Sequence, residues 1–90
     1  MVYINVRLAA ADYTQWRAAF DTRESVRRAA GATGIQQIFR DLGNPNTVTL
    51  VMEWQSVDQA RKFVQDPALR KAMEKSGVIG APEIRILNHA

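Results

Sequence analysis

The chain has no cysteine and only one histidine, His89, among its 90 residues. Without cysteine it can form no disulfide, and it has no thiolate for catalysis or metal binding. Metal ligands in proteins come mainly from cysteine, histidine and carboxylate side chains, and no pair of carboxylates is spaced for ligation along a helix. We therefore expect no metal site.

Long apolar runs are also absent. No segment approaches the roughly 20 apolar residues that span a bilayer. The start, Met1 to Asn5, lacks the charged region and the long apolar region of a signal peptide. We expect no membrane partner and, by default, a cytoplasmic location. With 47% hydrophobic residues, residues 1–90 predict a single globular domain, small enough that oligomerisation would help to stabilise it.

No strong excess of one charge is present. Twelve Lys and Arg face nine Asp and Glu, for a net charge of +3. Eight of the basic residues fall in predicted helices with acids between them, which is typical of a solvated surface: Arg23, Arg27, Arg28, Arg61, Lys62, Arg70, Lys71 and Lys75. No motif that reads bases accompanies them, so no nucleic-acid partner is predicted.

Alternating apolar and polar residues indicate strands. The pattern is clear over Val2–Leu8 and over Thr47–Trp54. We predict two further strands, Ile35–Asp41 and Glu83–His89. The turn-forming segment Leu42–Asn46 joins the second and third strands as an antiparallel hairpin.

Two helices are predicted between the strands. The first begins at Asp12 and runs to about Ala30, with a bend near Asp21-Thr22. The second begins at Ser56, which has capping-box spacing to Gln59. It restarts at Asp66-Pro67 and ends at Gly77, because proline is tolerated in a first helical turn and glycine ends helices.

The resulting order, β-α-β-β-α-β, predicts an α+β fold of ferredoxin-like topology. Its four-stranded antiparallel sheet carries both helices on one face. The other face is expected to present a mixture of polar and apolar residues, namely Tyr3, Asn5, Arg7, Thr49, Val51, Glu53, Arg85, Leu87 and His89. Its apolar members favour coverage by a partner, and a second copy packed sheet to sheet would supply it. We therefore predict a homodimer.

Several local motifs carry a resemblance to a known family. They are Asp12-Tyr13 with Trp16 and Phe20, Arg40-Asp41 with Asn44-Pro45-Asn46, Glu53-Trp54 followed by Phe63, Leu69-Arg70-Lys71-Ala72-Met73, and Gly77-Val78 with Gly80 and Pro82. With these the chain resembles the dimeric α/β-barrel superfamily, and most closely its small antibiotic-biosynthesis-monooxygenase-like and cyclase-like proteins. The resemblance implies a ligand pocket, either between the sheet and its helices or inside the barrel of the dimer.

The resemblance also implies a range of activities. They include cofactor-free oxygenation of polycyclic phenols, polyketide cyclisation, lactone isomerisation and haem degradation. Haem-degrading members are similar at Trp54 but carry a histidine iron ligand in the second helix. Here residues 57–75 contain no histidine, so haem binding is not expected. The resemblance therefore implies a protein without a cofactor.

Three strand residues are the candidate catalytic groups: Asn5, Arg7 and Arg85. They can orient a phenol or an enolate and stabilise a developing oxyanion through hydrogen bonds and charge. The alternative is a structural role in cross-strand or interface ion pairs, such as Arg7 or Arg85 with Glu53.

Six residues are the candidate ligand contacts: Tyr3, Trp16, Phe20, Glu53, Trp54 and His89. Trp54 can stack on an aromatic ligand or close the core, and Trp16 and Phe20 have the spacing of a buried helical stripe. His89 can shuttle protons, although its place near the end of the chain also suits an exposed or interface residue. No triad partner accompanies it.

The leading functional hypothesis is a homodimer that binds a small apolar or aromatic molecule, as a cofactor-independent monooxygenase or cyclase acting on an aromatic or polyketide-like substrate. One alternative is a non-catalytic ligand-binding or stress-related protein of the same fold. Another is an assembly module whose interior is filled. An enclosed cavity of about 300 Å³ or more would favour a ligand over the assembly module.

Overall fold

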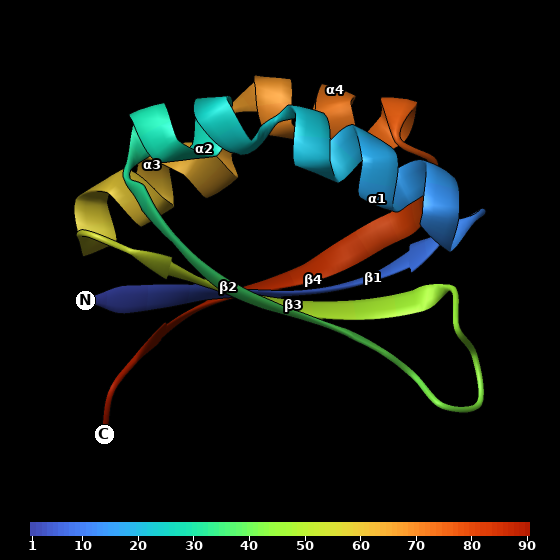
Figure 1. Cartoon of the computed structure of the whole chain (residues 1–90). Helices are drawn as coiled ribbons and strands as arrows, with labels where there is room; N and C mark the ends of the chain where they lie inside the picture. Colours follow the sequence, from blue (N-terminus) through green and yellow to red (C-terminus); the bar gives the residue numbers. More distant parts are fainter.

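The computed structural model describes residues 1–90 as a twisted sheet with helices on one side (Figure 1). Its elements are β1 (Val2–Ala10), α1 (Tyr13–Thr22), α2 (Glu24–Ala30), β2 (Ala32–Arg40), β3 (Thr47–Trp54), α3 (Val57–Gln65), α4 (Pro67–Lys75) and β4 (Val78–Asn88). None of the helices combines the length and the apolar character needed to cross a membrane.

The four strands form one antiparallel sheet in the order β2-β3-β1-β4. The predicted ferredoxin-like α+β fold is therefore confirmed. β1 lies in the centre, where Val2 pairs with Trp54 of β3 on one side and with Asn88 of β4 on the other. Both chain termini lie at the same end of the molecule (Figure 1).

The core lies between the sheet and the helices. Because side chains alternate along a strand, every second residue of β1 and β3 points toward the helix layer. The buried cluster consists of Val2, Ile4, Val6, Leu8, Ala10, Trp16, Ala32, Val48, Leu50, Met52, Trp54 and Ala60. Burying a residue such as Val, Leu or Ile stabilises the fold by about 1.5–3 kcal/mol, so β1 and β3 supply most of this stabilisation.

Each predicted helix consists of two shorter helices, as the bend predicted in the first and the two start signals of the second indicated. Arg23 separates α1 from α2 at the predicted bend. Asp66 ends α3 and also caps α4, where its carboxylate accepts a hydrogen bond from the backbone N–H of Ala68 at 2.9 Å. Ser56 caps α3 through the backbone N–H of Gln59, which confirms the predicted capping spacing.

The two edge strands begin earlier than predicted. β2 begins at Ala32 rather than Ile35, and β4 begins at Val78 rather than Glu83. The predicted start of β4 placed Pro82 outside the strand, whereas the proline lies within it. The register against β1 shifts beside Pro82, between the pairs Arg7–Glu83 and Ala9–Ile79. An edge strand tolerates a proline at such an irregularity, because not every backbone N–H of an edge strand is needed for a hydrogen bond to the neighbouring strand.

Candidate functional site

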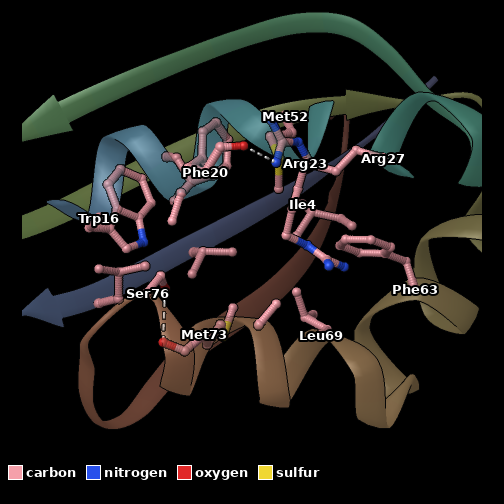
Figure 2. Close-up of a pocket in the computed structure, with 15 residues that line it drawn as sticks. Ile4, Trp16, Phe20, Arg23, Arg27, Met52, Phe63, Leu69, Met73 and Ser76 are labelled. Carbon is pink, nitrogen blue, oxygen red and sulfur yellow. Dashed lines mark hydrogen bonds between the residues drawn. The ribbon is translucent and has the colours of Figure 1, made fainter. Parts of the chain in front are cut away.

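A cavity lies between the helix layer and the sheet (Figure 2). It has a volume of about 70 Å³, and the free space around it, counted out into the solvent at its mouth, is about 600 Å³. Twelve of its 15 lining residues are hydrophobic. The lining comprises Ile4, Val6, Leu8, Leu50 and Met52 from the sheet, Trp16, Ala19, Phe20, Phe63, Leu69, Ala72 and Met73 from the helices, and the polar residues Arg23, Arg27 and Ser76.

Two stacked aromatic rings form part of the cavity wall. Trp16 and Phe20 lie one helical turn apart on α1, with ring centroids 5.0 Å apart and planes inclined by 24°. Both were predicted ligand contacts, and both line the cavity. Trp54 does not line it. Its side chain is fully buried and packs on Phe63 at 4.7 Å between centroids, in the core position that was its alternative interpretation.

Arg27 is the most buried charged residue of the chain, with 5% of its surface exposed. Its guanidinium carbon lies 3.6 Å from the centroid of the Phe20 ring, and its Nη1 donates a hydrogen bond to the backbone carbonyl of Phe20 at 2.8 Å. Its Nη2 is buried and has no hydrogen-bond partner. Burial lowers the pKa of Arg27, because removal from water disfavours the charged form.

Arg23 adds a second guanidinium to the same end of the cavity, across from Trp16 and Ser76 (Figure 2). Neither Arg23 nor Arg27 takes part in an ion pair, since the two ion pairs of the chain are Arg7–Asp41 and Arg17–Asp21. The hydroxyl of Ser76 donates to the carbonyl of Met73 at 2.8 Å. The polar groups that line the cavity are therefore two guanidinium groups, which carry positive charge, and the hydroxyl of Ser76, which already donates its hydrogen bond to a backbone carbonyl.

Arg27 was predicted, with the other basic residues of the helices, to lie on a solvated surface, and this prediction is wrong for Arg27. A signal was nevertheless present in the chain. The aromatic stripe Tyr13, Trp16 and Phe20 continues at the same alternating spacing of three and four residues to Arg23 and Arg27. Extending the stripe across the bend would have placed both arginines on the face that packs on the sheet.

The other six candidate residues lie on the opposite, open face of the sheet. Tyr3 pairs with Glu53 across β3, and Asn5 pairs with Arg85 across β4. Arg7 continues this row along β1, and His89 follows the end of β4. The sheet itself separates these residues from the cavity, because alternate side chains point to opposite faces.

Contacts within the chain already engage several of these open-face residues. The Tyr3 hydroxyl and the His89 Nε2 are 2.7 Å apart, and Asn5 Nδ2 donates to the Leu50 carbonyl at 3.4 Å. Arg7 pairs with Asp41 at 2.7 Å rather than with Glu53, the partner considered from the sequence.

The hydrogen bond from Arg7 lowers the pKa of Asp41, and the charge of Arg7 adds to this effect. This ion pair is exposed to solvent, so water and salt screen it.

Comparison with known proteins agrees with the fold. The profile of the antibiotic biosynthesis monooxygenase family matches residues 1–75. The chain therefore belongs to the antibiotic biosynthesis monooxygenase family, and the resemblance stated from the sequence is confirmed.

Solved structures of low sequence identity share the fold. A protein from Bordetella bronchiseptica named for the same family has a TM-score of 0.78 at 16% identity, with 99% of this chain and 96% of that chain covered. SnoaB, a cofactor-independent oxygenase from Streptomyces nogalater, has a TM-score of 0.73 at 11% identity, covering 99% and 91% of the two chains. A Mycobacterium tuberculosis protein has a TM-score of 0.70 at 13% identity, covering 99% and 94%. No curated protein sequence matches the chain.

Proposed function

We propose that the protein is a homodimer that binds a small, mostly apolar or aromatic molecule in the helix-side cavity and oxidises or cyclises it without a cofactor. The observation that carries this proposal is the apolar cavity with a cationic end, in a chain of the antibiotic biosynthesis monooxygenase family. The cofactor-independent oxygenase SnoaB shares the fold, which supports the oxygenase form of the proposal.

The cavity does not reach the size that would favour a ligand over an assembly module, so ligand binding requires it to widen. Its volume of about 70 Å³ is below the roughly 300 Å³ at the lower limit of ordinary ligand pockets. The lining includes Met52, Met73 and Leu69, and methionine side chains rearrange at little cost. The cavity also opens to solvent, so a ligand can enter by displacing these side chains rather than by separating the helices from the sheet.

In this cavity the protein would act by positioning and by charge. Trp16 and Phe20 supply an aromatic wall against which a planar substrate can pack. The guanidinium groups of Arg23 and Arg27 can stabilise an oxyanion as it develops. One reaction of this kind converts a CH₂ group flanked by phenolic rings into a carbonyl. The carbon loses two hydrogens, dioxygen supplies one oxygen atom to the carbonyl, and the other leaves as water.

A dimer would create a second possible site. If another copy covers the open face, Asn5, Arg7 and Arg85 become residues of an enclosed barrel interior, as considered from the sequence. Tyr3, Glu53 and His89 would line the same space. The proposal for these residues therefore depends on the dimer, whereas the helix-side cavity exists within one chain.

One observation favours the non-catalytic alternative. No histidine, aspartate or glutamate lines the cavity, so no ordinary general base faces a ligand there. A protein that only stores or carries an aromatic molecule needs no such base. An enzyme working in this cavity would need a substrate that ionises readily by itself.

Oxygen uptake with 1,8-dihydroxyanthrone as substrate tests the proposal. We expect uptake above the rate in buffer, without added metal or flavin, and formation of the corresponding anthraquinone. The variant Ala72→Leu should lower this rate about tenfold or more, because the added side chain occupies the cavity. Ala29→Leu is the matched control, since Ala29 is exposed on α2 and lies outside the cavity.

The same assay separates the two sites. If Asn5→Ala and Arg85→Ala lower turnover and Ala72→Leu does not, the reaction belongs to the open face. Unchanged rates in Asn5→Ala and Arg85→Ala remove the catalytic assignment of these residues. Ligand binding without oxygen uptake by the wild-type protein, also with other phenolic substrates, favours the non-catalytic alternative.

A further inference from the structure

The helix-side cavity contains two positive charges and no negative charge. We propose that its ligand is an anion, a planar aromatic or polyketide-like molecule whose carboxylate, phenolate or enolate oxygen binds between Arg27 and Arg23. This inference rests on the proposed function in one respect, the use of the cavity as a ligand site, and it specifies which chemical class the site accepts.

The first argument comes from the hydrogen bonds of Arg27. A guanidinium has five N–H donors, and a charged group that is almost fully buried normally has a partner for its charge. Here Nη1 is bonded to the Phe20 carbonyl, a neutral acceptor, whereas Nη2 is buried without a partner. The protein thus keeps the charged guanidinium of Arg27 out of water and leaves part of its hydrogen-bonding capacity unused. An anionic oxygen would complete it.

The second argument is that the protein supplies no carboxylate of its own. Glu24 and Asp21 are the acids whose charges reach Arg27, and neither is within ion-pair distance of it. Asp21 instead pairs with Arg17 at 3.0 Å. Arg23, four residues before Arg27, brings a like charge to the same end of the cavity. Two neighbouring cations repel each other, and an anion between them removes that repulsion.

The third argument concerns the rest of the ligand. Arg27 lies over Phe20, and Phe20 stacks on Trp16, so cation and rings form one continuous wall (Figure 2). A molecule that spans this wall needs an anionic end and a planar apolar body. The lining lacks a base, which suits a ligand that arrives ionised or whose acidic oxygen has its pKa lowered by nearby cations.

A pair of probes of equal shape tests the inference. 2-Naphthoate and 2-naphthamide differ in the charge of one small group, and their affinities can be measured by NMR titration of the full chain. We expect 2-naphthoate to bind about tenfold more tightly or better, equivalent to about 1.4 kcal/mol, because charge-assisted hydrogen bonds are the stronger ones. The Trp16 indole and Arg27 side-chain signals should shift.

Three variants locate the preference. Arg27→Met should abolish the preference for 2-naphthoate and leave the affinity for 2-naphthamide nearly unchanged. Arg23→Gln should reduce the preference. Arg28→Gln should keep it, because Arg28 is exposed on the same helix and does not line the cavity. The three variants remove one positive charge each, so a general loss of electrostatic attraction would affect them equally.

The outcomes separate the inference from the proposed function. Equal affinity of the wild-type protein for both probes overturns the anionic ligand but leaves a ligand cavity. A preference that survives in Arg27→Met and Arg23→Gln overturns it as well. Failure of both probes to bind at millimolar concentration overturns both ideas. A clear preference without any oxygen uptake supports the anionic ligand and rejects the oxygenase.

Folding of the key variant is checked by urea unfolding. Arg27→Met should be at least as stable as the wild-type protein, because replacing an unpaired buried charge with an apolar side chain is often neutral or stabilising. If it fails to fold, Arg23→Gln decides the question, since Arg23 is only half-buried. A full preference in that variant would then contradict the inference.

Discussion

On β3, Val48, Leu50 and Met52 are buried under the helices, whereas Thr49, Val51 and Glu53 on the other face remain partly exposed. The two faces are made by the same strands. They differ in whether their polar groups have hydrogen-bond partners and whether their apolar residues are buried. The helix side buries apolar residues and leaves the guanidinium of Arg27 incompletely bonded.

The open face has the opposite imbalance. The side chains of Tyr3 and His89, and of Arg7 and Asp41, are engaged with each other. The apolar residues of this face are not, since Phe39 is 52% and Leu87 is 42% exposed. An unmatched polar group in a cavity indicates a small ligand, and unmatched apolar area on a sheet indicates a protein partner. We therefore propose a different kind of partner for each of the two faces.

The largest effect is expected from a charge placed on the open face. If this face forms the homodimer, Phe39→Asp should weaken association by about a hundredfold or more, because a carboxylate would be buried without a partner. Val26→Asp is the matched control, since Val26 is 46% exposed but lies on α2. Sedimentation should give twice the chain mass of 10.1 kDa for the wild type and the control. Light scattering at micromolar concentration that gives the mass of one chain for the wild type would contradict the dimer.

A smaller effect is expected from the same substitution on the two faces of β3. Val48→Ala should lower the free energy of unfolding by about 2 kcal/mol, because Val48 is fully buried. Val51→Ala should lower it by less than about 1 kcal/mol in the monomer, since Val51 is only partly buried. Urea unfolding at several protein concentrations measures both. If both variants lose the same free energy of unfolding at low protein concentration, the distinction between the two faces is wrong. A loss in Val51→Ala that grows with protein concentration would indicate that the open face forms an interface.

The smallest effect concerns the exposed ion pair of Arg7 and Asp41. The pKa of Asp41 is lower in the folded chain than in the unfolded chain. The ion pair therefore stabilises the folded state at a pH above the pKa of Asp41 in the unfolded chain. This stabilisation is lost as the pH falls through the pKa of Asp41 in the folded chain. Asp41→Asn should therefore have a slightly lower urea midpoint than the wild type at neutral pH. The difference should vanish well below about pH 4, and added salt should reduce it at neutral pH. A difference that persists in acid would mean that the ion pair is not its cause.

Much of the fold was predictable because its central strands follow the simplest rule. β1 and β3 each bury one face, so their apolar residues alternate without interruption from Val2 to Leu8 and from Val48 to Trp54. The edge strands were placed less accurately. β4 contains Gly80 and Pro82, residues typical of loops, and only its pairing with β1 holds them in a strand.

The candidate site was predictable only where it followed a helical stripe. Trp16 and Phe20 were found by their spacing, and both line the cavity. Arg27 was missed because arginine on a helix usually faces water, and its burial depends on how α2 packs after the bend. The open-face residues were chosen for their polar side chains on strands. The alternation placed them on that face, and none of them lines the cavity.

The position of β1 also affects when the protein can fold during synthesis. β1 is made before the other three strands of the sheet and lies in its centre, with β3 on one side and β4 on the other. One side of its backbone therefore has no partner until residues 78–88 have been made. At roughly 5–20 residues per second the ribosome needs on the order of several seconds to reach them. During that interval the growing chain exposes an unpaired strand of valine, isoleucine and leucine, and this is when chaperones would be expected to bind it.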